Sequence, residues 1–172
     1  MPNWCCTDYI IEGKKDTLDK IHKAIENPSV KEGSNKDWEG NVLETLGIDY
    51  ANHFIRGFIE DSSLDNDVLR IYTTEAWART DFAELLEDKF PDIDIYWKAE
   101  EPGLAIYETN DSTGKYFTDK YYIEVYKDDD YITEYFETKE DAYNWIKEVT
   151  GYKTNEEIED SKDIFIHEFE IV

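Results

Sequence analysis

Alternating apolar and polar residues predict strands in four places within the first hundred residues. These segments are 3–12, 53–61, 67–73 and 92–98. Alternation of this kind is typical of antiparallel strands that have one buried and one exposed face. It is clearest in the last segment, where Ile93, Ile95 and Trp97 fall on the face that we expect to be buried.

Apolar residues at helical spacing predict two helices between these strands. The first covers 16–26, with Asp16 as the expected N-cap, and ends before Pro28. The second covers 80–90, with Thr80 as the expected N-cap. Each helix carries a single apolar stripe, so each should bury one side against a sheet.

Further strands and one helix are predicted after residue 103. Pro102-Gly103 suits a type II turn, and turn-forming residues at 110–114 and 128–130 separate strand-like segments. Thr138 opens a helix that Gly151 should end, and 164–172 reads as a final strand.

The predicted order over 3–100 is strand, helix, a loop with a short helix, strand, strand, helix, strand. That order is typical of the α+β ferredoxin-like sandwich, a βαββαβ arrangement with helices on one face of an antiparallel sheet. We therefore expect a ferredoxin-like core at 1–110, with the helices at 16–26 and 80–90 on the same face. The C-terminal β-rich extension, 111–172, carries one helix and is expected to pack on the same sheet, within a single structural domain.

The net charge of the chain indicates which classes of binding partner are expected. The 172 residues include 18 Lys+Arg and 42 Asp+Glu, a formal net charge of −24 at pH 7. Such a chain is repelled by phosphate backbones and anionic membranes, so direct nucleic-acid or lipid binding is disfavoured. A basic protein or peptide, or a divalent cation, is the expected partner. The alternative is that the charge serves solubility alone.

The cellular setting follows from the cysteines and from the apolar runs. Adjacent Cys5 and Cys6 point to opposite faces of a strand and rarely bridge, so a reducing cytoplasm is expected. No apolar run approaches the ~20 residues of a membrane span, and the first residues lack a secretory leader.

Three short blocks resemble the YubB-like family of plasmid- and phage-borne proteins. They are Met-Pro-Asn-Trp-Cys at 1–5, Thr-Glu-Ala-Trp at 74–77 and Glu-Glu-Pro-Gly at 100–103. The resemblance implies a ferredoxin-like fold and a mobile-element setting, but no reaction. The chain departs from the family at Thr7, where Asn is usual, and at Trp38, around which a Trp-Gly block is not recognisable.

Motifs for catalysis or cofactor binding are missing from the sequence. There is no Gly-x-Ser-x-Gly turn and no Gly-rich phosphate loop. His22, His53 and His167 lack the spacing of metal ligands. We therefore expect no enzyme activity, no cofactor and no metal.

Two pairs of residues are the candidate interaction sites. Trp77 and Arg79, at a strand-to-helix junction, could form a cation–π or ligand-stacking patch. The alternative is that Trp77 plugs the core. Glu100 and Glu101, beside the Pro-Gly turn, could form an exposed anion cluster for a basic partner or a cation. The alternative there is a turn flanked by solvated charges.

These observations favour an acidic accessory protein of a mobile element that acts by protein–protein contact with a basic partner. One alternative is a nucleic-acid mimic, whose carboxylates would form an ordered stripe and occupy a DNA-binding groove. Another is a small-molecule binder or enzyme that uses sheet-face carboxylates, such as Glu100 or Glu101 next to Trp97. The oligomeric state is not predicted.

Overall fold

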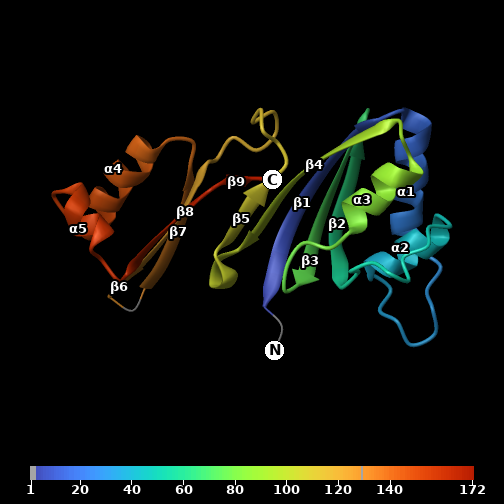
Figure 1. Cartoon of the computed structure of the whole chain (residues 1–172), viewed down its shortest axis with the longest axis horizontal. Coiled ribbons are helices and arrows are strands. Elements are labelled where there is room, and N and C mark those ends of the chain that lie inside the picture. Colours follow the sequence, from blue (N-terminus) through green and yellow to red (C-terminus); the bar gives the residue numbers. More distant parts are fainter. Residues whose placement is uncertain (1–2, 129) are drawn as a thin grey trace. The chain divides into compact units, whose positions relative to one another are not determined.

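The computed structural model describes residues 3–128 and 130–172 (Figure 1). Within these residues the fold is α+β, with five α-helices and nine strands. The chain divides into two compact units, Met1–Ile106 and Tyr107–Val172. Residues 1 and 2 of the family resemblance and residue 129 of the acidic turn lie outside the described residues.

The first unit contains four strands, three α-helices and a short 3-10 helix. They are β1 (Trp4–Gly13), α1 (Lys15–Glu26), α2 (Glu39–Thr45), β2 (Gly57–Asp65), β3 (Val68–Ala76), α3 (Phe82–Lys89), β4 (Ile93–Glu101) and η1 (Pro102–Leu104). The strands lie in the order β2-β3-β1-β4, and each neighbouring pair is antiparallel. In this register Tyr9 of β1 lies between Ile71 of β3 and Trp97 of β4.

All three helices of the first unit cover one face of this sheet (Figure 1). Leu18 and Ile21 of α1 and Leu86 of α3 share a single core with the inward residues of the strands. Tyr9 meets Phe82 of α3 edge to face, with ring centroids 6.0 Å apart. The predicted placement of both helices on the same face is confirmed.

Alternation along β4 also has the predicted phase. Ile93, Ile95 and Trp97 are all buried, at 7%, 4% and 7% exposure. The same phase continues to the end of the strand, so that Ala99 and Glu101 point inward as well. Glu101, a predicted site residue, therefore lies on the buried face of β4.

Several predicted element ends are wrong. β2 begins at Gly57 and runs to Asp65, so its turn to β3 is tighter and lies later than expected, with Asn66 at φ 53°. Helix α1 begins at Lys15, one residue before the expected N-cap. Pro102 opens a 3-10 helix in place of a type II turn.

Thr80 is not the N-cap of α3, which begins at Phe82 after Asp81. The Thr80 side chain is 1% exposed, and its hydroxyl donates to a buried carboxyl group, Glu39, 2.9 Å away. A tertiary hydrogen bond has therefore replaced the local one that the sequence suggested.

The second unit contains five strands and two helices. They are β5 (Ile106–Thr109), β6 (Tyr121–Lys127), β7 (Asp130–Phe136), α4 (Lys139–Thr150), α5 (Asn155–Glu159), β8 (Ile164–Glu168) and β9 (Glu170–Ile171). β6 lies between β7 and β8, antiparallel to both, and β5 pairs with β9 in parallel. Thr138 caps α4 and Gly151 ends it at φ 85°, as predicted. Helix α5 confirms the short acidic helical turn that the sequence predicts at 154–157, in addition to the longer helix.

The core of the second unit lies between its three-stranded sheet and its helices (Figure 1). Ile123 and Val125 of β6 pack with Ala142 and Ile146 of α4 and with Ile158 of α5. The expectation that 111–172 extends the sheet of a 1–110 core stays a prediction. Within the described residues, no helix has the length and apolar character needed to cross a bilayer.

Candidate functional site

Trp77 lies at the surface, in the segment that joins β3 to α3. Its side chain is 50% exposed, and its backbone has φ 70°, in the left-handed region. Bulky residues rarely adopt this conformation, which costs about 1–3 kcal/mol. Two backbone hydrogen bonds hold the segment, from Trp77 N to Asn3 O at 2.9 Å and from Ala76 N to Arg56 O at 3.2 Å. The alternative that Trp77 plugs the core is therefore wrong.

Other aromatic residues and an arginine surround Trp77. The Arg56 guanidinium lies 4.0 Å from the Phe54 ring centroid and 5.0 Å from that of Trp77. Trp4, which is 45% exposed, lies opposite Ala76 in the sheet, and its ring centroid is 6.0 Å from that of Phe58. We call this group the Trp77 patch: Trp4, Phe54, Arg56, Phe58 and Trp77.

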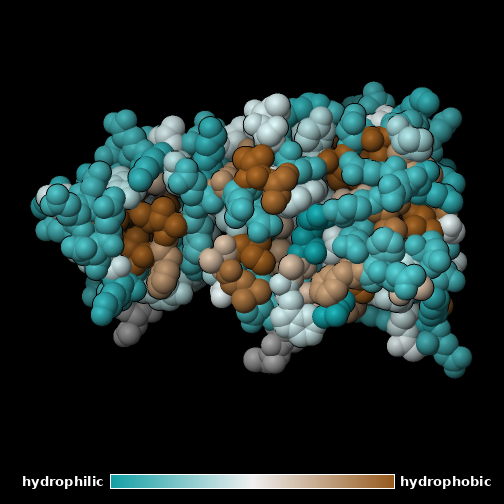
Figure 2. Space-filling model, viewed as in Figure 1, coloured by the Kyte–Doolittle hydropathy of each residue, from teal (hydrophilic) through white to brown (hydrophobic). Residues whose placement is uncertain are grey.

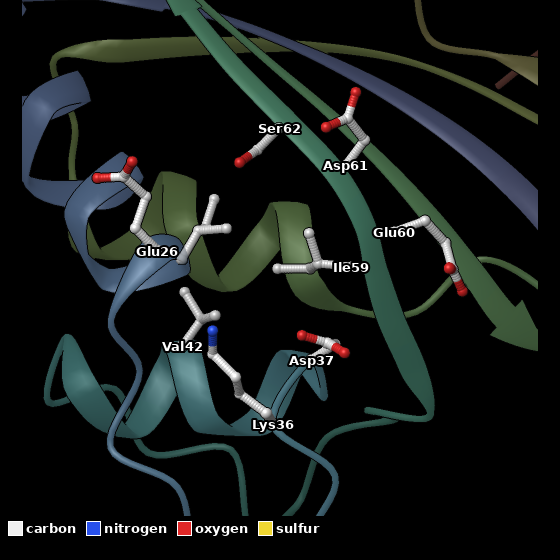
Figure 3. Close-up of a pocket in the computed structure, with 9 residues that line it drawn as sticks. Glu26, Lys36, Asp37, Val42, Ile59, Glu60, Asp61 and Ser62 are labelled. Atoms are coloured by element: carbon white, nitrogen blue, oxygen red, sulfur yellow. The ribbon is translucent and has the colours of Figure 1, made fainter.

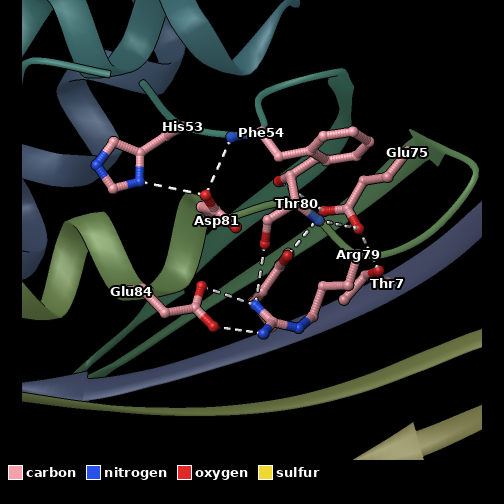
Figure 4. Close-up of polar contacts among 9 residues, drawn as sticks. Thr7, His53, Phe54, Glu75, Arg79, Thr80, Asp81 and Glu84 are labelled. Atoms are coloured by element: carbon pink, nitrogen blue, oxygen red, sulfur yellow. Dashed lines mark hydrogen bonds and ion pairs between the residues drawn. The ribbon is translucent and has the colours of Figure 1, made fainter. Parts of the chain in front are cut away.

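Arg79 does not form the predicted pair with Trp77, and Arg56 is the arginine that lies beside the Trp77 ring. The Arg79 guanidinium lies over the Trp97 ring, 4.1 Å from its centroid. Both of its terminal nitrogens donate to the Glu84 carboxylate, and Nη1 also donates to the Thr80 carbonyl at 3.0 Å (Figure 4). Arg79 therefore joins the sheet to α3, with its side chain 19% exposed.

Glu100 and Glu101 have different environments, because neighbouring strand residues point to opposite faces. Glu100 lies on the face away from the helices, 3.6 Å from Lys98 Nζ. Glu101 points inward and is 4% exposed. Burial raises the pKa of the Glu101 carboxyl, and a hydrogen bond from Asn3 partly offsets this shift. The predicted exposed anion cluster is therefore wrong for Glu101.

A pair of buried carboxyl groups, Glu39 and Glu75, lies beside the Trp77 segment, and both side chains are fully buried. The Glu75 carboxylate accepts hydrogen bonds from Tyr9 at 2.7 Å, Thr7 at 2.7 Å and Thr73 at 3.0 Å. It also accepts one from the Thr80 amide at 3.2 Å (Figure 4).

Glu39 receives fewer donors than Glu75. One of its oxygens accepts from the Thr80 hydroxyl at 2.9 Å and from the Gly57 amide at 3.2 Å. The other oxygen is buried and, among the described residues, receives no donor. Burial first, and then the neighbouring Glu75 carboxylate, raise the pKa of Glu39 well above its usual range. This shift favours the protonated form of Glu39.

Gly57 makes this arrangement possible. It pairs with Glu75 across the sheet, and a Cβ atom at Gly57 would lie 2.4 Å from the carboxyl carbon of Glu39. Only glycine lets the Glu39 side chain approach the strand this closely.

The sequence pattern could have predicted the burial of Glu75 but not that of Glu39. Thr73 and Glu75 continue the alternation of Leu69 and Ile71, so Glu75 is in phase with the buried face of β3. Nothing similar marks Glu39, which begins the short helix α2 after a segment with weak patterning. Only the folded chain brings the two carboxyl groups together.

The carboxyl pair holds the Trp77 segment in place. Glu75, near the end of β3, accepts a hydrogen bond from the Thr80 amide near the end of the segment, and the Thr80 hydroxyl donates to Glu39. Both carboxyl groups are fully buried, and their hydrogen bonds with Thr80 connect them to this segment. Within the described residues, no cluster of three or more His, Cys, Asp or Glu could hold a metal ion.

A separate cavity of about 210 Å³ lies beside β2 (Figure 3). Its lining includes apolar Ile59 and Val42, the hydroxyl of Ser62, and the opposite charges of Lys36 and Asp37. Glu60 also belongs to the lining, but its carboxylate accepts from Thr74 at 2.6 Å and points away from Ile59 and Ser62. The charged residues of the lining are mainly acidic, with Glu26, Asp37, Glu60 and Asp61 against Lys36, and the lining includes none of the four predicted site residues.

Comparisons with protein families, with curated proteins and with solved structures find no match. The resemblance to the YubB-like family is therefore untested and stays a prediction.

Proposed function

We propose that this protein is a non-enzymatic, acidic accessory protein that acts by binding a basic protein or peptide through the Trp77 patch. The observation that carries the proposal is the position of Trp77. A strained backbone and two tertiary hydrogen bonds keep this large apolar side chain half exposed, beside the guanidinium of Arg56. Trp and Arg are the residue types that most often dominate the energy of protein–protein contacts.

The proposal includes a ferredoxin-like fold and membership of the YubB-like family, with its mobile-element setting. The strand order β2-β3-β1-β4, with antiparallel neighbours and helices on one face, supports the fold. The three resembling blocks, distant in sequence, meet around Asn3. Its carbonyl accepts from Trp77 N, and its side chain hydrogen-bonds Glu101.

Charge supports a basic partner. The net charge of −24 raises the local concentration of cationic partners and speeds their association. In the view of Figure 2, hydrophilic residues cover most of the surface and apolar residues form separate patches. Cys5 and Cys6 are both free thiols, which supports action in a reducing compartment such as the cytoplasm.

Quantitative affinity capture from a host lysate tests the proposal. The parent, Trp77→Ala and the control Tyr72→Ala would be immobilised, and captured proteins quantified by mass spectrometry over a salt series. Tyr72 is also an exposed aromatic residue of the first unit, but it lies outside the Trp77 patch. We expect a basic protein that Trp77→Ala loses and Tyr72→Ala keeps, and whose capture weakens with salt.

Two results would overturn the proposal. One is a set of captured proteins that is the same for the parent and Trp77→Ala. The other is a Trp77-dependent partner that is acidic, or whose binding does not change with salt.

A further inference from the structure

The three-stranded sheet of the second unit has one face against its helices and one face away from them. Ile123 and Val125 of β6 point into the helix-covered core. The intervening residues of β6, with their cross-strand partners, form the other face. We call it the tyrosine face: Tyr122, Glu124, Tyr126, Tyr131, Thr133, Tyr135, Phe165 and His167.

Three large aromatic side chains are exposed at one end of the tyrosine face. Tyr126, Tyr131 and Phe165 are 49%, 51% and 47% exposed. The Tyr126 ring centroid lies 4.8 Å from that of Tyr131 and 5.9 Å from that of Phe165, and the Phe165 ring stands edge-on to Tyr126. Contiguous exposed aromatic residues of this kind mark binding surfaces.

A carboxyl group lies at the centre of the same face. Glu124 is 6% exposed, accepts a hydrogen bond from the Tyr131 hydroxyl, and has an oxygen 2.7 Å from His167 Nε2. These contacts fix the carboxyl group and the Tyr131 ring relative to one another. A ligand on the exposed rings would therefore meet a preorganised surface with an acid beneath it.

The tyrosine face has no lysine or arginine among its eight residues, all of which the structure describes, and its one histidine, His167, is paired with Glu124. Lys127, at the end of β6, points toward α4 and donates to the Val149 carbonyl at 2.7 Å. The face thus combines the negative ring faces of its aromatic residues with the Glu124 carboxyl, in a chain of net charge −24.

This chemistry selects a flat organic cation. Aromatic ring faces attract cations, and a guanidinium group also stacks on them because it is planar and weakly hydrated. Nucleic-acid bases could stack as well, but their phosphates would be repelled by the charge of the chain. We propose that the tyrosine face binds arginine side chains of a basic peptide or protein. This inference rests on the proposed function, since it names the chemistry of the basic partner and gives it a second contact.

Binding of a fluorescent hexa-arginine peptide to the full chain tests the inference. Fluorescence anisotropy would be measured at about 0.15 M salt, where long-range attraction between exposed charges is largely screened. The variants are Tyr126→Leu, Phe165→Leu and the double variant, which leave the net charge unchanged. We expect each to weaken binding by roughly threefold to tenfold, the range of an exposed to a partly desolvated cation–π contact.

Matched variants and probes separate this site from general attraction to an acidic protein. Tyr126→Phe keeps the ring and should bind hexa-arginine like the parent, and so should Tyr72→Leu in the first unit. Hexa-lysine carries the same charge without a planar group, so the parent should bind it more weakly than hexa-arginine.

Equal hexa-arginine affinity in the parent and the double Leu variant would overturn the inference. So would an equal loss in Tyr72→Leu, or tighter binding of hexa-lysine. These outcomes leave the lysate capture unaffected. A basic partner that depends on Trp77, without any effect of the tyrosine-face variants on hexa-arginine, would retain the proposed function and reject this inference alone.

Discussion

Glu39 and Glu75 are both fully buried and lie beside one another. Glu75 accepts hydrogen bonds from Tyr9, Thr7 and Thr73, whereas one oxygen of Glu39 receives no donor from the residues that the structure describes. Burial and the neighbouring Glu75 carboxylate raise the pKa of Glu39, which favours its protonated form. The pair links α2 to β3 and holds the segment that carries Trp77.

The raised pKa of Glu39 has a defined effect on stability. In the unfolded chain this carboxyl titrates near 4.5, whereas in the folded protein it titrates well above that value. Between the two values, the folded state holds a proton that the unfolded state has released. The free energy of unfolding therefore falls as pH rises from about 4.5 through the folded pKa, by up to about 1.4 kcal/mol per pH unit.

Glu39→Gln should remove this dependence. Its amide can donate to Glu75 and its oxygen can still accept from Thr80 and Gly57, so the variant should fold. Urea unfolding at several pH values between 5 and 8 would compare the slopes, with Glu32→Gln as a control at an exposed carboxylate of the same unit. Parallel pH profiles for the parent and Glu39→Gln would show that Glu39 does not hold the proton.

Gly57→Ala should destabilise the first unit. The added Cβ would lie 2.4 Å from the Glu39 carboxyl carbon, and both groups are buried, so the side chain or the strand must shift. Overpacking of this kind costs about 1–3 kcal/mol. Gly33→Ala is not a suitable control, because Gly33 has φ 83°. Ser62→Ala, on the same strand, serves instead, and an equal unfolding midpoint for the parent and Gly57→Ala would contradict the prediction.

Trp97→Ala should be among the most damaging single substitutions in the first unit. Trp97 is 7% exposed, and its ring lies under the Arg79 guanidinium. Truncating a buried aromatic residue costs about 3–5 kcal/mol. Trp4→Ala is the matched control, because Trp4 is 45% exposed, and it should cost much less. Similar unfolding midpoints for the two variants would show that this face of β4 is not core.

The stability of a Trp77 variant should depend on which residue replaces the tryptophan. Both Trp77→Gly and Trp77→Ala remove the indole, but only glycine adopts φ 70° without steric penalty. The Gly variant should therefore be more stable than the Ala variant by about 1 kcal/mol, as measured by urea unfolding. A more stable Ala variant would indicate that the segment relaxes out of the left-handed region once the indole is gone.

The sequence by itself determined the features that depend on neighbouring residues. Strand alternation identified the buried face of β4 through Ile93, Ile95 and Trp97, and helical spacing identified α1 and α3. The caps of α4 followed from Thr138 and Gly151, because a cap is made by residues a few positions apart. The net charge of −24 is a property of composition alone.

The tertiary structure decided everything that depends on residues far apart in the chain. Arg56, and not Arg79, reached Trp77, because the segment before β2 runs beside the end of β3. Thr80 donates to the Glu39 carboxyl group and does not cap α3. Glu101 is buried because it lies in phase with Trp97 along β4. Periodicity in the sequence predicts which face of a strand or helix a residue occupies. Strand register and helix packing decide which side chains from distant parts of the chain are in contact. The contact between Glu39 and Glu75 therefore exists only in the folded chain.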